Sequence, residues 1–323
     1  MEDRNSDEDL LIVPEQREEV SQSEAGTAKA EAGFRIVLIG KTGAGKSATG
    51  NIILRETIFR SAMSSSTVTL ECQKETREFE SQVLAVVDTP GLFDTELAPW
   101  EVVSALTRCI SFAAPGPHAF LVVIQPCRFT KEEQETVKII QKVFGESAAQ
   151  YTLALFTHGD QMKEEGVTAE KLISESKPLR DFISKCGDRY HVFNNREKED
   201  ATQVRELLEK INTMVQLNGS KYYTNEKFIA AEKAIQEKVE KILRKNPHFT
   251  PREARIKAER QNRFIKSALT VIGSGGAAAA LGVGIEFVTV GAVGAVGGPV
   301  GLVAGLAVAS IAVALRREAC KIQ

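Results

Sequence analysis

The sequence lacks the cysteine and histidine patterns of disulfide-bonded and zinc-dependent proteins. Its five cysteines are scattered and odd in number, no Cys-x-x-Cys pair occurs, and its four histidines form no His-Glu-x-x-His. Neither a disulfide framework nor a zinc site is therefore indicated. Cysteines that need no pairing suit a reducing cytosol, so we expect a cytoplasmic protein.

A strong charge of one sign is also missing. The 41 Lys and Arg against 43 Asp and Glu give a net charge of −2, which provides no basic footprint for nucleic acid. Residues 1–32 have no signal-peptide layout, because the charge before the four apolar residues 10–13 is negative. With ten acidic and three basic residues, this segment is expected to be a disordered acidic tail.

The most informative segment that is present is a glycine-rich loop between the apolar run 34–39 and a helix expected to begin near Lys46. It fits the pattern Gly-x-x-x-x-Gly-Lys-Ser/Thr in the strand–loop–helix setting of a phosphate-binding loop. Backbone N–H groups and the helix N-terminus would bind phosphate, Lys46 would reach the β- and γ-phosphates as a catalytic contact, and Ser47 would ligate Mg²⁺. An ordinary glycine-rich turn is the alternative. The predicted nucleotide contacts here are Gly40, Lys41, Thr42, Gly43, Ala44, Gly45, Lys46, Ser47 and Ala48.

A second buried strand, residues 83–87, ends in Asp88-Thr-Pro-Gly91. An Asp at the carboxyl end of a core strand is where a Mg²⁺-bound water is held, so Asp88 is predicted to contact the metal through water. Gly91 can bring its N–H against a γ-phosphate. The same four residues could form an ordinary turn, but after a phosphate loop they indicate a nucleotide-sensing switch.

A third apolar strand precedes residues 157–160, Thr-His-Gly-Asp. GTP-binding proteins usually carry Asn-Lys-x-Asp here, and the Asp accepts two hydrogen bonds that guanine donates and adenine does not. Asp160 therefore favours GTP over ATP, while His158 can stack on the purine. Capping of the next turn is the alternative role for Asp160. Residues 191–193 indicate the last base-side strand, and Asn195 in the loop after it is a further predicted nucleotide contact.

These motifs together resemble those of the GTPases of immunity-associated proteins, the GIMAP family. The resemblance covers about residues 34–245, and the box Arg-Phe-Thr-Lys-Glu-Glu-Gln at 128–134 makes it more specific than a generic GTPase match. It implies a doubly wound α/β G domain with a mostly parallel sheet, related to those of septins and chloroplast import receptors. The segments that carry it are residues 35–51, 87–94, 115–120, 128–134, 156–160 and 193–195.

The family resemblance also implies what the protein binds and where it acts. Members bind GTP and GDP with Mg²⁺, associate with intracellular membranes, and assemble through the G domain when GTP is bound. Homodimers, oligomers or assemblies with paralogues are the implied partners. This chain departs from the family in His158 and in an unusual C-terminal segment.

Residues 64–69, Ser-Ser-Ser-Thr-Val-Thr, lie where a Thr should complete the Mg²⁺ shell in the GTP state. Both Thr67 and Thr69 are available, and the resemblance favours Thr69. A serine-rich solvated loop is the structural alternative, and it is compatible with a loop that the γ-phosphate orders.

The catalytic machinery is incomplete in the sequence. Leu92 stands where many GTPases have a water-orienting Gln, so slow intrinsic turnover is expected. An arginine supplied in trans could stabilise charge in the transition state, and Arg128, before the capping-box sequence 130–133, is our candidate. A structural Arg on that turn is the alternative.

The chain divides into five parts by composition. In the charged part that follows the G domain, one apolar stripe is formed by Phe228, Ile235, Val239 and Ile242. Asn246-Pro247 breaks the helix, and residues 250–253 begin a second helix. These helices either fold back on the G domain or form an arm that moves with nucleotide state. The parts are the acidic tail 1–32, the G domain 33–223, the charged amphipathic helical region 224–266, the hydrophobic Gly/Ala-rich segment 267–315 and the basic tail 316–323.

Residues 267–315 contain almost only Gly, Ala and aliphatic residues, with no basic residue and a single acid, Glu286. The segment exceeds the roughly 20 residues of one membrane span, and basic residues flank both of its ends. Both features predict a membrane hairpin with cytosolic ends, helped by small residues at every fourth position from Gly297 to Ala309. A soluble low-complexity tail is the alternative. We therefore expect association with an intracellular membrane through this segment.

Two functional hypotheses follow. In the first, the protein is a membrane-associated GTP switch that hydrolyses GTP to GDP and phosphate slowly and is stimulated by dimerisation. In the second, it is a GTP-dependent scaffold with negligible hydrolysis. An ATP-driven enzyme is a third reading, which Asp160 disfavours.

Overall fold

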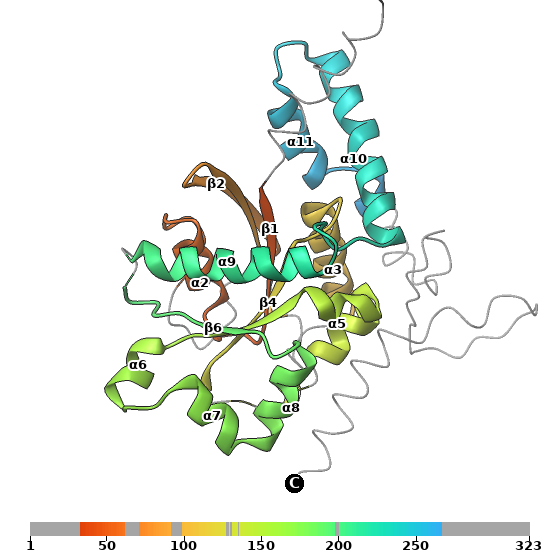
Figure 1. Cartoon of the computed structure of the whole chain (residues 1–323). Helices are drawn as coiled ribbons and strands as arrows, with labels where there is room; N and C mark the ends of the chain where they lie inside the picture. The colour runs from red at the N-terminus through yellow and green to blue at the C-terminus, as the bar shows by residue number, and fades with distance from the viewer. Residues whose placement is uncertain are drawn as a thin grey trace, which may run out of the picture. The chain divides into compact units, whose positions relative to one another are not determined.

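The computed structural model describes residues 33–61, 71–91, 99–126, 129, 131–134, 136–197 and 200–266. Its centre is a six-stranded sheet in the order β2-β3-β1-β4-β5-β6 (Figure 1). Neighbouring strands run parallel except β2, which pairs antiparallel with β3 at one edge, so the predicted doubly wound, mostly parallel α/β sheet is confirmed. The strands are β1 (Phe34–Ile39), β2 (Gln73–Phe79), β3 (Gln82–Asp88), β4 (Ala119–Ile124), β5 (Thr152–Phe156) and β6 (Tyr190–Val192).

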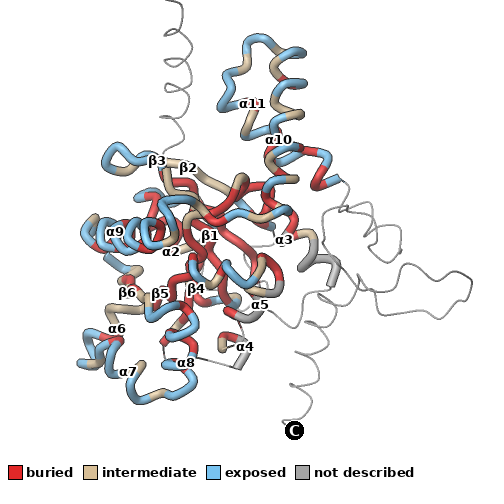
Figure 2. The backbone as a smooth tube through the Cα atoms, turned by 45° about the vertical axis from the view of Figure 1, so that its right-hand side comes forward, coloured by how far each residue is buried: buried red, intermediate tan, exposed pale blue. Residues whose placement is uncertain are grey.

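Helices cover both faces of the sheet, as a parallel sheet requires because its strands are apolar on both sides. Figure 2 shows the buried strands between more exposed helices. The helices are α2 (Lys46–Ile53), α3 (Pro99–Ala113), α4 (Lys131–Gln134), α5 (Thr136–Phe144), the 3₁₀ helix η2 (Glu146–Tyr151), α6 (Gly159–Glu164), α7 (Ala169–Glu175), α8 (Lys177–Lys185), α9 (Ala201–Leu217), α10 (Glu226–Lys245) and α11 (Pro251–Arg260).

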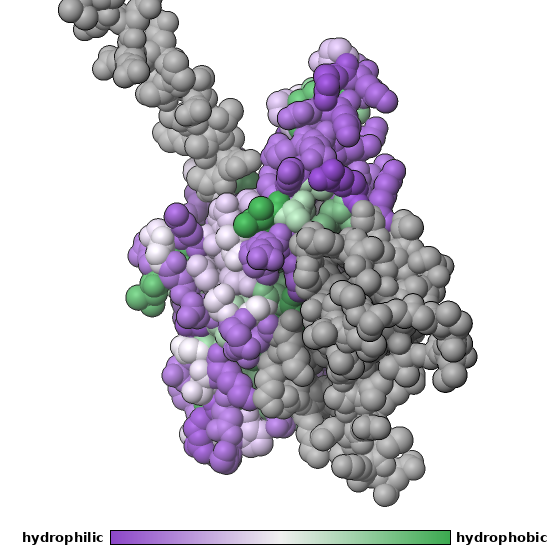
Figure 3. Space-filling view, turned by 90° about the vertical axis from the view of Figure 1, so that its right-hand side faces the viewer, coloured by the Kyte–Doolittle hydropathy of each residue, from purple (hydrophilic) through white to green (hydrophobic). Residues whose placement is uncertain are grey.

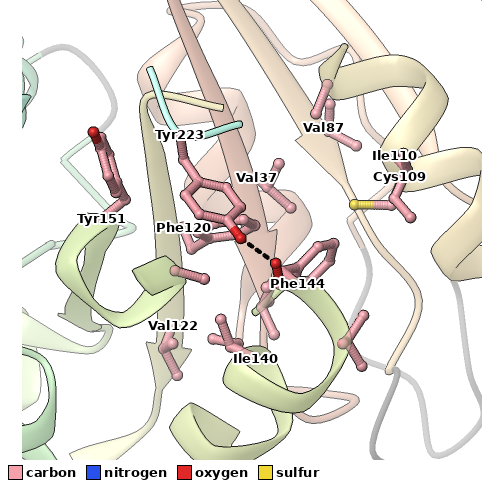
Figure 4. Packing of buried hydrophobic residues seen from close by; sticks show 14 of the residues in the cluster. Val37, Val87, Cys109, Ile110, Phe120, Val122, Ile140, Phe144, Tyr151 and Tyr223 are labelled. Atoms are coloured by element: carbon pink, nitrogen blue, oxygen red, sulfur yellow. Dashed lines mark hydrogen bonds between the residues drawn. The ribbon is translucent and has the colours of Figure 1, made fainter. Parts of the chain in front are cut away.

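Alternation along β1 divides the core into two clusters. Ile36 and Leu38 join the cluster formed with α2 and α9, whereas Val37 and Ile39 join the cluster formed with α3, α5 and α8. All four side chains are fully buried. Figure 4 shows the second cluster, where the hydroxyl of Tyr223 donates a hydrogen bond to a backbone carbonyl of α5. Packing on both faces fixes β1, and with it the loop that follows.

The first helix after the G domain ends, and the second begins, where the sequence predicts. α10 ends at Lys245, before Asn246-Pro247, and α11 begins with Pro251 behind a capping box in which Thr250 and Glu253 satisfy each other's backbone N–H groups. The apolar stripe of α10 is buried at Phe228 and packs into the cluster that contains α3. In this structure the helical region is therefore folded back on the G domain.

Among the residues that the structure describes, no helix is long and apolar enough to cross a membrane. The predicted acidic tail 1–32, membrane segment 267–315 and basic tail 316–323 lie outside the described residues.

Candidate functional site

The loop between β1 and α2 has a backbone that a side chain would disrupt. Gly40 has φ of +157°, and a Cβ built there would lie 2.4 Å from the carbonyl oxygen of Val123 in β4. Because that oxygen belongs to a central strand, it has no room to move. Gly45, with φ of +97°, caps the N-terminus of α2. The loop therefore follows a path that glycine permits, with the positive end of α2 directed at it.

Lys46 is buried, and its ammonium bends back over this loop. Its Nζ donates hydrogen bonds to the carbonyls of Gly40 at 3.0 Å and Lys41 at 2.9 Å. The backbone N–H of Ala44 also donates to the Lys41 carbonyl, at 3.2 Å. The lysine is thus held at the loop, where a phosphate group would lie between its charge and the helix N-terminus.

Ser47 and Asp88 meet at the carboxyl ends of neighbouring strands. The Ser47 hydroxyl donates to Asp88 Oδ2 at 2.6 Å, and Asp88 is paired in register with Leu38 of β1. Asp88 is buried, and the hydroxyl of the adjacent Thr89 donates to the Leu38 carbonyl at 2.7 Å. A hydroxyl and a carboxylate are the oxygen ligands that Mg²⁺ prefers, and Mg²⁺ usually takes only a few protein ligands beside water and phosphate. The residues present therefore fit a Mg²⁺ ion bound with a nucleotide.

The loop after β5 lies directly against the phosphate loop. The Thr157 hydroxyl bonds to the carbonyls of Ala44 at 3.1 Å and Ile124 at 3.3 Å, and it lies 2.8 Å from His158 Nδ1. A Cβ built on Gly45 would lie 3.2 Å from Thr157 Cγ2 and 3.1 Å from Asn195 Nδ2. Loops that follow three strands far apart in the sequence thus converge at one edge of the sheet, where open α/β sheets bind their ligands.

Two buried acceptor oxygens lie in the base-side loops. Within the described residues, Asp160 Oδ2 and Asn195 Oδ1 have no hydrogen-bond donor. Asp160 Oδ2 is 2.8 Å from Arg196 Nε, which is ion-pair distance without hydrogen-bond alignment. A buried acceptor without a donor costs free energy unless a ligand supplies one. The arrangement therefore suits a base that donates hydrogen bonds.

Sequence reasoning missed three residues that shape this site. Arg196 approaches Asp160. Gln203 in the first turn of α9 holds the loop after β6 through its side-chain amide: Oε1 accepts from the Asn194 N–H, and Nε2 donates to the Asn194 carbonyl. Asn51 in α2 accepts from the backbone N–H groups of residues 58 and 59 and donates to the Phe59 carbonyl at 2.8 Å. No periodicity or motif distinguishes these polar residues from others nearby, because their partners are set by loop shape.

The remaining predicted site residues are placed as follows. Gly91 is buried directly after β3, and His158 adopts a left-handed conformation immediately before α6. Thr69 and Arg128 lie outside the described residues, as do Thr67 and Leu92, so the roles predicted for these residues stay predictions.

Comparisons with known proteins agree with this geometry. The model of the AIG1 family matches residues 34–243. Human GTPase IMAP family member 8 is 37% identical over 195 residues, which are 59% of this chain and 29% of that protein. Immune-associated nucleotide-binding protein 8 of Arabidopsis thaliana is 35% identical over 235 residues, 70% of this chain and 67% of that protein. The matched part of the chain thus spans less than a third of the human relative and about two thirds of the plant one.

Solved structures show weaker likeness. Toc33 from Arabidopsis thaliana, in complex with GDP and Mg²⁺, is 16% identical with a TM-score of 0.44, covering 59% of this chain and 87% of that one. The FeoB G-domain from Methanococcus jannaschii is 15% identical with a TM-score of 0.40, covering 57% and 98%.

Proposed function

The chain belongs to the AIG1 family, and from that premise we propose that it is a switch protein that binds GTP and GDP together with Mg²⁺. The observation that carries the proposal is the convergence of three loops. On the phosphate side, Ser47 Oγ lies 2.6 Å from Asp88 Oδ2. On the base side, the Thr157 hydroxyl donates a hydrogen bond to the Ala44 carbonyl of the phosphate loop. A nucleotide bound across this edge would meet Lys46 at its phosphates and Asp160 at its base.

The bound Mg²⁺ would neutralise phosphate charge, and its protein contacts would be Ser47 directly and Asp88 through water. Thr69 is the proposed third contact in the GTP state. In the described structure the Ser47 hydroxyl donates to the Asp88 carboxylate, so the two groups lie close enough to serve one ion.

This metal assignment predicts a linkage between Mg²⁺ and nucleotide affinity. Chelating Mg²⁺ should weaken binding of GTP to the wild-type protein by about tenfold or more, because phosphate charge is then unscreened. In Ser47→Ala the affinity in Mg²⁺ should fall to nearly the value measured in chelator, as titration calorimetry would show. Ser184→Ala, at an exposed serine of α8, is the matched control and should behave as wild type. Full Mg²⁺ dependence in Ser47→Ala would contradict the assignment.

Turnover and assembly belong to the same proposal. Leu92 cannot orient a water, so we propose slow intrinsic hydrolysis of GTP that a second copy of the chain stimulates through Arg128 in trans. We further propose that residues 267–315 attach the cytoplasmic protein to an intracellular membrane. Support for these steps comes from the sequence and from the family.

The dimerisation step predicts how the rate of hydrolysis depends on protein concentration. Turnover per molecule should rise across a hundredfold range of concentration in wild type and stay flat in Arg128→Ala, because only a dimer completes the site. Exposed Arg180→Ala on α8 is the control and should retain the rise. A flat, near-zero rate with tight GTP binding would instead support the scaffold that hydrolyses almost nothing.

A further inference from the structure

The net charge of the chain is not spread evenly. Residues 226–266, which contain α10 and α11, hold twelve Lys and Arg against six Glu and no Asp, a net charge of +6. The whole chain has a net charge of −2, so all other residues together carry −8. Such an asymmetry between parts of a chain points to an anionic partner for the basic part.

Most acidic side chains of α10 and α11 already interact with other groups of the protein. Glu232 pairs with Arg255 at 2.8 Å, Glu259 pairs with Lys74 at 2.7 Å, and Glu253 closes the capping box of α11. Glu237 lies 3.3 Å from Arg263 and Glu240 lies 3.9 Å from Arg244. Five of the six carboxylates are therefore already occupied by the protein's own groups.

A set of exposed cations has no such partner. We call α10, α11 and the turn between them the hairpin, and we define five of its exposed cations, named below, as the basic hairpin face. Among the described residues, no carboxylate lies within ion-pair distance of these five side chains. Figure 3 shows the mainly hydrophilic surface of these two helices. The basic hairpin face consists of Lys233, Lys241 and Lys245 on α10 and of Arg252 and Arg260 on α11.

Two exposed apolar side chains continue the same rows of residues. Ile229 stands one turn before Lys233, and Ile256 stands one turn from both Arg252 and Arg260, so each isoleucine lies on the same side of its helix as these nearest cations. Ile229 is 59% exposed and Ile256 is 47% exposed. Cations alternating with single large apolar residues are typical of helices that lie on anionic membranes, where the apolar side chains enter the headgroup region.

We propose that the basic hairpin face binds an anionic lipid surface and so orients the G domain at the membrane. The inference rests on the proposed function in one respect, since it takes the membrane association proposed for residues 267–315 as given. Those residues begin directly after Lys266, so attachment there would hold the hairpin close to the headgroups. Nucleic acid would also attract the cations, but it would leave the two exposed isoleucines unused.

The test is flotation of the full chain with two kinds of vesicle, phosphatidylcholine alone and phosphatidylcholine with about one third phosphatidylserine. The lipid concentration for half-binding should be lower on the anionic vesicles, and this preference should fade at high salt. A triple variant should lose affinity for the anionic vesicles roughly a hundredfold, at about fivefold per cation, and keep its affinity for the neutral vesicles. The variant combines Lys233→Gln, Lys241→Gln and Lys245→Gln.

The matched control removes three exposed cations from the G domain: Lys163→Gln, Lys171→Gln and Lys185→Gln combined should keep the preference for anionic vesicles. As a second readout, fluorescence of Ile256→Trp should shift to the blue on anionic vesicles only. This signal reports contact between the hairpin and lipid, even if residues 267–315 hold the protein on both kinds of vesicle.

Equal half-binding on both vesicles, equal losses in both triple variants, or an unshifted Trp spectrum would overturn the proposal. Binding of the hairpin face to duplex DNA without a preference among lipids would overturn it in favour of nucleic acid. GTP affinity is measured in each variant, so a failure of nucleotide binding, which would refute the proposed function, is distinguished from a failure of lipid recognition.

Discussion

At the scale of single residues, the phosphate-side contacts were predictable because they belong to one continuous motif. The phosphate loop requires glycine at Gly40, lysine at Lys46 and a hydroxyl at Ser47, and their geometry follows from local chain path. His118, by contrast, lies in segment 115–120 of the family resemblance, but that segment assigns its ring no role. Its ring is held between Phe34 and Tyr222, and its Nδ1 accepts the backbone N–H of Arg35 at 2.9 Å. That role depends on packing that the sequence does not reveal.

The environment of His118 predicts sensitivity to acid. Burial, and then the positive charge of the nearby Arg35 guanidinium, lower the pKa of His118 from 6.5 to about 3. A protonated Nδ1 would also lose the hydrogen bond that it accepts from the Arg35 N–H. The unfolded chain therefore binds the proton first. The contribution of neutral His118 to the free energy of unfolding is complete above about pH 6.5. It falls as pH drops toward the folded-state pKa, by up to about 1.4 kcal/mol per pH unit.

His118→Asn tests this, because its amide oxygen can accept the Arg35 N–H without titrating. Urea unfolding between pH 7 and about pH 4 should show a shallower loss of stability in the variant than in wild type. His191, whose pKa burial lowers to about 4, accounts for part of the slope that remains. His248→Asn, on the exposed turn between α10 and α11, should leave the curve unchanged. An identical slope in His118→Asn would refute the role assigned to its protonation.

At the scale of elements, the ends of α10 and α11 were predictable and their docking was not. Asn246-Pro247 and the capping box at Thr250 are local signals. The contacts that hold α11 are distant in sequence: Lys74 of β2 donates to Glu259 Oε1 at 2.7 Å across 185 positions. Arg255 joins the same carboxylate at 3.1 Å and also binds the Ala114 carbonyl at the end of α3. Periodicity shows that a helix face is covered, but it does not name the covering element.

Removing Glu259 should destabilise the docked helices strongly. Its carboxylate is only 3% exposed, and burial lowers the pKa of its partner Lys74 despite the opposing attraction of Glu259. Glu259→Ala leaves two cations without their shared anion, so the free energy of unfolding should fall by about 3–5 kcal/mol in urea titrations. The double variant Lys74→Met with Glu259→Leu should recover much of the loss, because no buried charge is then left unpaired.

The control for this pair is Glu240→Ala. Glu240 lies 3.9 Å from Arg244 at the surface, and both side chains are mostly exposed, so the change should cost less than about 1 kcal/mol. A similarly small cost for Glu259→Ala would show that the buried ion pairs do not hold α11 in place.

At the scale of the whole molecule, the fold class was implied by the family resemblance, and the order of motifs agrees with it. A phosphate loop after the first strand, an Asp after a later core strand and a base-side Asp after another place the strand ends at one edge of a doubly wound sheet. The sequence predicts a strand over residues 72–79, and β2 confirms it, but its antiparallel pairing was not predicted because its polar residues carry no signal of pairing direction. Thr69, Arg128 and residues 267–315 remain predictions from sequence and family, since they lie outside the described residues.

The central claim, recognition of guanine nucleotide at this edge, is tested most directly by equilibrium affinities of the full chain for GTP and ATP in Mg²⁺, in wild type and in Asp160→Ala. The account predicts that wild type binds GTP at least about a hundredfold more tightly than ATP, because only guanine donates to the Asp160 carboxylate, whose Oδ2 atom is buried. In Asp160→Ala, the affinity for GTP should fall to the level of the affinity for ATP, and the affinity for ATP should not change. Equal affinities in wild type, or full discrimination in Asp160→Ala, would contradict it.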